Sequence, residues 1–324
     1  MFQRILVPLD GSPQAERALP VATRLAQASG GSITLLRVVT HPHDAALSFL
    51  QSPREGEREI EAAHSQAVDY LEGIAHSSIL AGVESVLQVA DSIPAQTILS
   101  TAHLGQVDSI VMCSHSDAGF KRWALGSVAQ TVARHSPVPV LILRGEADAP
   151  ALLRLEAPRP LRVLVPLDGS VFAEAALFPA AVLSAALSAP APGALHLTLV
   201  LIGENTHDAK VGEFIEANMQ EALAYLETVE QRLRTGDAAK LSLEISSSVA
   251  IGMDVADTLM NVAEGNPGEG EGLSVRAFDL IALATHGRHG ADLWVMGSVT
   301  ERILEVSRLP LLIIRPAELP RGDG

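Results

Sequence analysis

A glycine-rich loop in the second half of the chain carries residue types that bind phosphate. It follows an apolar run that ends at Ala284, contains Gly287 and Gly290, and leads to Gly297-Ser298, which opens a helix-like segment. Glycines let a ligand come close to the backbone, and the N–H groups of a helix N-terminus can hydrogen-bond an oxyanion. The loop therefore favours a phosphate site, with further donors from the side chains of His286, Arg288, His289 and Ser298.

The Gly-Ser pair also has an interpretation that needs no ligand. Ser298 followed by Glu301, and Ser127 followed by Gln130, match a capping box, in which side chains satisfy the first N–H groups of a helix. From spacing alone, a phosphate site and a structural cap stay open as equal alternatives.

Two aspartates, Asp10 and Asp168, each end an apolar strand-like run and precede a helix-like segment. In open α/β sheets, ligands bind at the carboxyl edge of the strands. A carboxylate there can accept hydrogen bonds from a ribose hydroxyl or an adenine amino group. The alternative is a turn-forming aspartate that bonds its own backbone.

These residues lie at matching places because the chain repeats itself. RILVPLDGS at 4–12 matches RVLVPLDGS at 162–170, LGSV at 125–128 matches MGSV at 296–299, and VPVLILR at 138–144 matches LPLLIIR at 309–315. We therefore expect two copies of one domain. The predicted organisation is a domain at 1–145, a linker at 146–160 and a second domain at 161–317.

Each copy alternates short apolar runs with helix-like segments, which predicts an α/β fold with a parallel sheet covered by helices on both faces. Ser12 is expected to cap the first helix, with Pro13 in its first turn. The predicted strands are 5–9, 33–39, 84–89, 109–113 and 138–143 in the first copy, and 162–167, 196–202, 241–249, 280–284 and 311–314 in the second.

The composition of the 324 residues excludes several classes of protein. A hydrophobic share of 48% supports buried cores, and 38 acidic against 23 basic residues give a net charge of -15, which disfavours nucleic acid and anionic membranes as partners. A single cysteine, Cys113, and a first segment that reads as a strand indicate a cytoplasmic protein. The uncharged stretch 175–195 contains prolines and is interpreted as a helix, a turn and the next strand.

Other chemistry has weaker support. The sequence has neither a P-loop lysine motif nor a dinucleotide GxGxxG pattern. His41, His43 and Asp44, or His286 with His289, do not reach the ligand number of a metal site. Cys113, at a strand end, is interpreted as a buried small residue.

Both copies resemble domains of the universal stress protein family. The residues that carry the resemblance are VPLDGS in the first strand, the Asp-Ile/Leu-Ile/Val strand before the loop, the Gly-Ser helix start and the closing Pro-Val/Leu-Leu-Ile-Ile/Leu-Arg strand. The resemblance implies two doubly wound, open, parallel five-stranded sheets of Rossmann-like or flavodoxin-like order. It also implies that the domains pair like a dimer through 138–144 and 309–315, and that only some members bind ATP.

The ATP-binding members share a spaced glycine motif. It consists of a glycine, two further residues, a second glycine, nine further residues and then Gly-Ser or Gly-Thr. The second copy departs from this pattern only at Ala284, which replaces the first glycine. The resemblance thus implies a nucleotide site in the second copy, whose members are Pro166, Asp168, Ile202, Ala284, Gly287, Arg288, Gly290, Gly297 and Ser298. Among these, Asp168 and Ile202 would lie beside the nucleoside, and Gly287, Gly297 and Ser298 would hold phosphates.

The first copy departs further from the pattern. Cys113 and Ser116 replace both early glycines, and Asp117 adds a negative charge where a triphosphate would have to lie. The equivalent positions that remain are Pro8, Asp10, Val38, Gly126 and Ser127. We expect an impaired or empty site in this copy.

The sequence predicts a cytoplasmic tandem stress-response sensor or regulator that binds ATP, with or without Mg²⁺, mainly in its second domain. No general base is placed for efficient turnover, so at most slow hydrolysis is expected. The expected partners are an adenine nucleotide, the intramolecular domain pairing and a second copy in a homodimer. One alternative is an interaction module that binds no nucleotide, and another is a slow ATPase or phosphotransfer enzyme that uses Arg288 or a histidine.

Overall fold

The computed structural model describes residues 1–40, 53–105, 107–114, 125–144, 152, 160–203, 209–265, 277–286 and 296–316. They form two compact units, the first from residues within 1–146 and the second mainly from residues 147–324. Each unit is described by itself.

The first unit alternates strands and helices as the repeat predicts. Its elements are β1 (Arg4–Leu9), α1 (Pro13–Glu16), α2 (Ala18–Ser29), β2 (Ser32–Val39), α4 (Pro53–Ala75), the 3-10 helix η1 (Ser78–Leu80), β3 (Glu84–Asp91), α5 (Pro94–Leu104), β4 (Ser109–Ser114), α6 (Ser127–His135) and β5 (Val140–Arg144). The strands lie in the order β3-β2-β1-β4-β5, and each described pairing is parallel.

The second unit repeats this plan. Its elements are β6 (Arg162–Leu167), α8 (Val171–Glu174), α9 (Leu177–Ser188), β7 (Gly193–Ile202), α10 (Ala209–Thr235), η2 (Asp237–Lys240), β8 (Leu243–Gly252), α11 (Val255–Ala263), β9 (Leu280–Ala284), α12 (Ser298–Val306) and β10 (Leu311–Ile314). The strand order is β8-β7-β6-β9-β10, again parallel.

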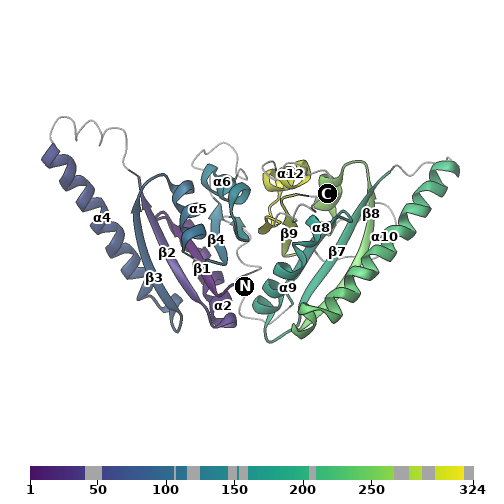
Figure 1. The fold of residues 1–324 in the computed structure, drawn as a ribbon, viewed down its shortest axis with the longest axis horizontal. Helices are drawn as coiled ribbons and strands as arrows, with labels where there is room; N and C mark the ends of the chain where they lie inside the picture. The colour runs from purple at the N-terminus through teal and green to yellow at the C-terminus, as the bar shows by residue number, and fades with distance from the viewer. Residues whose placement is uncertain are drawn as a thin grey trace, which may run out of the picture. The chain divides into compact units, whose positions relative to one another are not determined.

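This order makes each unit a doubly wound sheet, so the predicted fold class is confirmed. From β1 to β2 to β3 the chain steps in one direction, and from β3 to β4 to β5 it steps back on the other side of β1. Right-handed crossovers therefore place α2 and α4 on one face and α5 and α6 on the other. Figure 1 shows α4 lying along β3 and α10 lying along β8 in the same way.

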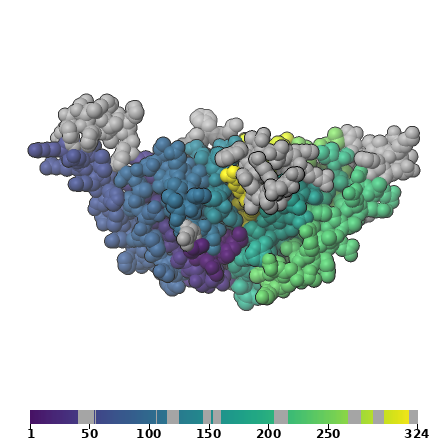
Figure 2. All heavy atoms as spheres, viewed as in Figure 1, coloured from purple at the N-terminus to yellow at the C-terminus, as the bar shows by residue number. Residues whose placement is uncertain are grey.

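The cores consist of the strands and of the helix faces that pack on them. Ile5, Leu6 and Val7 of β1 are fully buried, as are Val163, Leu164 and Val165 of β6. Strands that are buried on both sides read as continuous apolar runs, which is why β6, β9 and β10 have the predicted bounds. The outward-facing residues of α4 and α10, coloured blue and green in Figure 2, form part of the surface of each unit.

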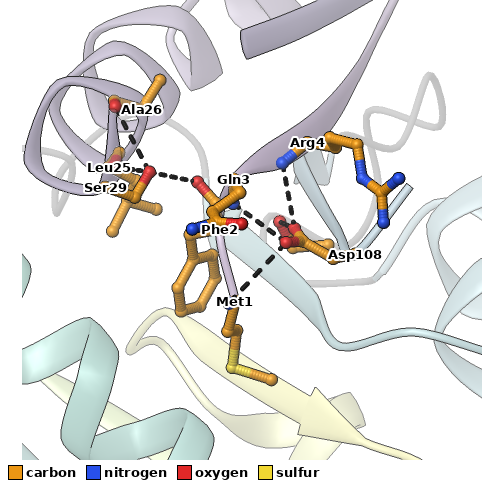
Figure 3. Close-up of polar contacts among 9 residues, drawn as sticks. Met1, Phe2, Gln3, Arg4, Leu25, Ala26, Ser29 and Asp108 are labelled. Atoms are coloured by element: carbon orange, nitrogen blue, oxygen red, sulfur yellow. Dashed lines mark hydrogen bonds and ion pairs between the residues drawn. The ribbon is translucent and has the colours of Figure 1, made fainter. Parts of the chain in front are cut away.

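The amino edge of each sheet is held by a repeated aspartate. Asp108 accepts hydrogen bonds from the backbone N–H groups of Gln3, at 2.9 Å, and Arg4, at 3.3 Å, and Figure 3 shows it facing both. Asp279 accepts from the N–H of Arg162 at 3.0 Å in the second unit. These bonds fix the start of the first strand of each unit, at the opposite edge from the predicted sites.

The stretch 175–195 is the predicted helix, turn and strand. It contains α9, a turn and the start of β7. By length and composition alone, the segment Val171–Ser188 is apolar enough to cross a membrane, but 56% of it is buried inside the protein. Burial of this kind is typical of a core helix that packs on a sheet.

Candidate functional site

In the second unit, the end of β9 and the start of α12 are tied together at the carboxyl edge of the sheet. The N–H of Gly297 donates to the carbonyl of Thr285 at 2.8 Å, and the Thr300 hydroxyl donates to the carbonyl of Ala284 at 2.9 Å. Both bonds hold the N-terminus of α12 beside the strand end. The helix start is therefore positioned by the protein itself.

The capping box predicted at Ser298 is wrong. The N–H of Glu301 donates to the carbonyl of Gly297 at 2.9 Å, so Gly297 is the N-cap and Ser298 is the first helical residue. Within the described residues, no side-chain hydrogen bond caps this helix, and Ser298 is exposed. In the first unit, α6 likewise has Gly126 as an N-cap without a side-chain bond, and Ser127 is exposed.

Nothing in the described residues requires a glycine at position 297. Its φ of -61° and ψ of 143° are open to any residue, and among the described atoms the nearest to an added Cβ would be the carbonyl oxygen of Thr285, at 3.4 Å. A glycine N-cap supplies no side-chain acceptor for the helix's first N–H groups. The N–H groups of Ser298, Val299 and Thr300 thus have no partner within α12.

His286 is held inside the protein. The Thr285 hydroxyl and His286 Nδ1 lie 2.8 Å apart, and the two residues are 0% and 4% exposed. Its Nδ1 is therefore engaged with a neighbouring side chain rather than directed at solvent. The predicted phosphate-loop residues Gly287, Arg288 and Gly290 lie outside the residues that the structure describes, as does His289.

Asp168 forms the turn that starts α8. Its Oδ1 accepts from the N–H of Ser170 at 2.9 Å and from the Ser170 hydroxyl at 2.6 Å. The Ser170 hydroxyl in turn accepts from the N–H of Ala173 at 3.1 Å and caps the helix. Gly169 has a φ of 81°, a conformation that favours glycine. The turn-forming interpretation is thus confirmed for one carboxylate oxygen.

The nucleoside positions predicted for the two copies are not equivalent in strand register. Leu9 and Leu167 are equivalent residues of the repeat; Leu9 pairs with Arg37, and Leu167 pairs with Leu199. Arg37 and Leu199 are therefore equivalent, and Val38 is the residue after Arg37. The counterpart of Val38 is therefore Val200, which is half-buried, while Ile202 lies two residues further on and is 71% exposed. The sequence analysis missed Val200 because only the register aligns the two strands.

The first unit has a similar turn with a different surrounding. Asp10 is exposed, and its Oδ1 accepts from the N–H of Ser12 at 2.9 Å. Ser12 caps α1 through the N–H of Ala15 at 3.1 Å, as predicted. Pro8 and Val38 are half-buried.

Arg37 distinguishes the carboxyl edge of the first unit, and the sequence analysis did not identify it. Its Nη1 donates to the carbonyl of Leu9 at 3.4 Å, and a Cβ at Gly11 would lie 3.5 Å from its guanidinium. The second unit has Leu199 at this register position. A cation therefore lies against the turn of the first unit, where the second unit has an apolar side chain.

The end of β4 contains the single cysteine. Cys113 is buried, and burial raises the pKa of its thiol to about 12. The interpretation of Cys113 as a buried small residue is confirmed, since a thiol this hard to ionise is a poor nucleophile. His115, Ser116 and Asp117 lie outside the described residues.

Within the described ranges of the chain, no group of three His, Cys, Asp or Glu residues could hold a metal ion. Of the histidines and the aspartate weighed as ligands, only His286 is described, and its Nδ1 contacts Thr285. The described part of the site thus offers backbone N–H groups and hydroxyls that can donate hydrogen bonds, and one carboxylate that can accept them. This combination suits an anionic ligand that also carries hydroxyls.

Comparison with known proteins shows relatives of one kind. The model of the universal stress protein family matches residues 1–144 and again 161–315. Universal stress protein YxiE of Bacillus subtilis is 30% identical over 148 residues, which are 44% of this chain and the whole of that protein. A universal stress protein of Thermus aquaticus is 33% identical over 147 residues and is also covered completely. Each of these relatives corresponds in length to one half of the chain.

One solved structure shows the same architecture over nearly the whole chain. The crystal structure of a universal stress protein from Archaeoglobus fulgidus matches 97% of this chain and 99% of its own, with a TM-score of 0.61 and 19% identity. A universal stress protein crystallised in complex with cAMP matches 44% of this chain with 22% identity and a TM-score of 0.31. The first match extends through both units, so the tandem arrangement has a counterpart of known fold.

Proposed function

Because the chain belongs to the universal stress protein family and carries the family's domain twice, we propose that its second domain binds an adenine nucleotide, with ATP as the expected ligand. Binding would make the chain a stress-response sensor or regulator. The first domain is expected to be impaired in binding or empty.

The observation that carries the proposal is the start of α12. Gly297 is a glycine that neither its backbone angles nor its packing against the described residues require, and within the described part of the chain no side chain caps the helix that follows. A ligand that comes close to the backbone at this position would explain the glycine, because a side chain there would block it. The N–H groups that follow it and the Ser298 hydroxyl suit phosphate oxygens, since a helix N-terminus carries a partial positive charge.

The Asp168 turn supports the nucleoside end of the same proposal. Asp168 follows β6, the central strand at which the strand order reverses, and ligands bind at such points in open α/β sheets. A carboxylate can accept several hydrogen bonds, so Asp168 is of a type that can also accept one from a ribose hydroxyl. Pro166 and Val200 would contact the base or the sugar, and Ile202 would contact its outer edge.

The remaining members of the site come from the resemblance. Gly287, Arg288 and Gly290 would complete the phosphate loop, and Ala284 would stand in place of its first glycine. A metal ion, if one is used, would arrive with the nucleotide as its Mg²⁺ complex, because carboxylates and phosphates are the ligands that Mg²⁺ prefers.

The direct test is a calorimetric titration of the purified chain with ATP, with and without Mg²⁺. We expect saturable binding. If no binding is seen at about 1 mM nucleotide, which corresponds to a binding free energy weaker than about 4 kcal/mol, the proposal is rejected in favour of an interaction module. Phosphate release above the buffer background would instead support the slow ATPase.

The site is tested by Gly297→Val. The isopropyl group would occupy the approach to the helix N-terminus, so we expect ATP affinity to fall by about tenfold or more. Stability should change by no more than about 1 kcal/mol, because the position accepts a side chain. The matched control is Gly126→Val, at the N-cap of α6, which should leave ATP affinity unchanged. Equal losses in the two variants would place binding in both domains.

A further inference from the structure

The two tyrosines of the chain make the same contact in the two units. The Tyr70 hydroxyl on α4 donates to Oε1 of Glu16 at 2.9 Å, and the Tyr225 hydroxyl on α10 donates to Oε1 of Glu174 at 3.0 Å. Glu16 and Glu174 each end the one-turn helix that follows the Asp-Gly-Ser turn. The contact therefore links the long helix of each unit, α4 or α10, to the segment that carries Asp10 or Asp168.

In the second unit, a continuous set of hydrogen bonds leads from this contact to Asp168. The N–H of Glu174 donates to the carbonyl of Ser170 at 3.3 Å, and Ser170 donates to Asp168 Oδ1 through both its N–H and its hydroxyl. A displacement of Glu174 would move α8 and, with it, the Asp168 carboxylate.

The second unit strengthens the contact with an additional cation. Arg232, seven residues after Tyr225 and so on the same face of α10, donates to Oε2 of Glu174 at 2.8 Å. Both oxygens of Glu174 are thus held by side chains of α10. The position seven residues after Tyr70 is Ser77, which lies beyond the end of α4 and cannot supply this charge.

The electrostatics keep Tyr225 in the donor form. Burial raises the pKa of its hydroxyl well above the ordinary value, the hydrogen bond and charge of Glu174 raise it further, and the charge of Asp168 adds to this effect. Arg232 acts in the opposite direction but does not reverse it. The tyrosine therefore remains protonated at neutral pH, and its hydroxyl lies within electrostatic reach of Asp168.

We propose that Tyr225, Glu174 and Arg232 form a clamp that positions the Asp168 turn for nucleotide binding in the second unit. The role in binding rests on the proposed function. The three residues act through Asp168 and do not touch the ligand. Among the described residues of the first unit, the equivalent contact is the bond between Tyr70 and Glu16, at a turn that we expect to hold no nucleotide.

The first test is the amide hydrogen exchange of the full chain without ligand. Tyr225→Phe removes one hydroxyl and keeps the ring, so exchange within residues 168–174 should become about fivefold faster, the equivalent of one hydrogen bond. Tyr70→Phe is the matched control and should act on residues 10–16 instead. Unchanged exchange at 168–174 in Tyr225→Phe would overturn the clamp, whether or not the chain binds nucleotide.

The second test measures ATP affinity in a double-mutant cycle. Tyr225→Phe should weaken ATP binding about fivefold in the wild-type background and have no effect in the Asp168→Ala background, because the clamp acts through that carboxylate. Tyr70→Phe should leave ATP affinity unchanged. A merely structural clamp would lower stability in both tyrosine variants without this coupling.

The outcomes separate the clamp from the nucleotide site. If the wild-type chain binds ATP and Tyr225→Phe binds it equally well, the positioning role is wrong and the site stands. If Tyr225→Phe weakens ATP binding equally in the wild-type and Asp168→Ala backgrounds, a role through this carboxylate is also rejected. If the wild-type chain binds no ATP, the proposed site is wrong, and the exchange measurement alone decides whether the clamp orders the turn.

Discussion

At the scale of single residues, Asp168 has a structural role, to which the proposed function adds a role in binding. Its Oδ1 receives two hydrogen bonds from Ser170, and these bonds start α8. The same carboxylate stands at the carboxyl edge of the central strand of its sheet. A substitution separates the structural role from the binding role only if it keeps an oxygen that accepts the bonds from Ser170 and removes the negative charge.

Asp168→Ala should lower the free energy of unfolding by about 1–2 kcal/mol, since it removes a charged acceptor of two hydrogen bonds. Asp168→Asn keeps an oxygen at the position of Oδ1 and should lose less than about 0.5 kcal/mol. Urea denaturation measures both, and calorimetry gives the ATP affinity of each variant. Equal stability of the Ala variant and the wild type would show that the turn does not need this side chain.

At the scale of elements, β7 and β8 are joined by an imidazole as well as by their backbones. His196 on β7 lies 2.8 Å from the Ser246 hydroxyl through Nδ1 and 2.8 Å from the Ser248 hydroxyl through Nε2. Burial lowers the pKa of His196 to about 4, the charge of Arg162 lowers it further, and Glu230 acts in the opposite direction. The folded strand pair thus holds a neutral imidazole.

This lowered pKa predicts how stability changes with pH. An unfolded histidine titrates near 6.5, so between pH 6.5 and about 4 the unfolded chain binds a proton that the folded chain does not. The contribution of His196 to the free energy of unfolding should therefore be complete above pH 6.5 and decrease as the pH falls toward 4. Thr34 is the equivalent residue in the first unit, so His196→Thr is the natural variant to test. When the free energy of unfolding is measured by urea denaturation at several pH values, this part of its pH dependence should disappear in the variant. An unchanged slope would contradict it.

At the scale of the whole molecule, the two units share a fold but differ at their carboxyl edges. The first has a cation, Arg37, against its turn, and the second has Leu199 at that position and the Arg232 contact behind its turn. Duplication of a domain keeps the sheet and the core, because both depend on the apolar pattern. The residues at the strand ends are free to diverge.

We expect one nucleotide per chain, because the first copy has Cys113 and Ser116 in place of both loop glycines and a negative charge at Asp117. A ligand that binds only the folded second unit stabilises it by about 2.7 kcal/mol at 100 times its dissociation constant. Amide exchange should therefore slow in the strands of the second unit on addition of ATP and stay constant in those of the first, with a calorimetric stoichiometry of one. A stoichiometry of two, or protection in β1 to β5, would contradict the assignment.

The sequence by itself determined the repeat, the α/β class and most strand positions, because these depend on contiguous apolar runs and on turn residues such as Asp-Gly-Ser. It also identified the cap at Ser12, which is a local contact. Only the tertiary structure decided that α12 begins after Gly297, that Val200 matches Val38, and that Tyr225 reaches Glu174, 51 residues away in sequence. The strand register and contacts between distant segments depend on packing across the whole sheet, which no local pattern records.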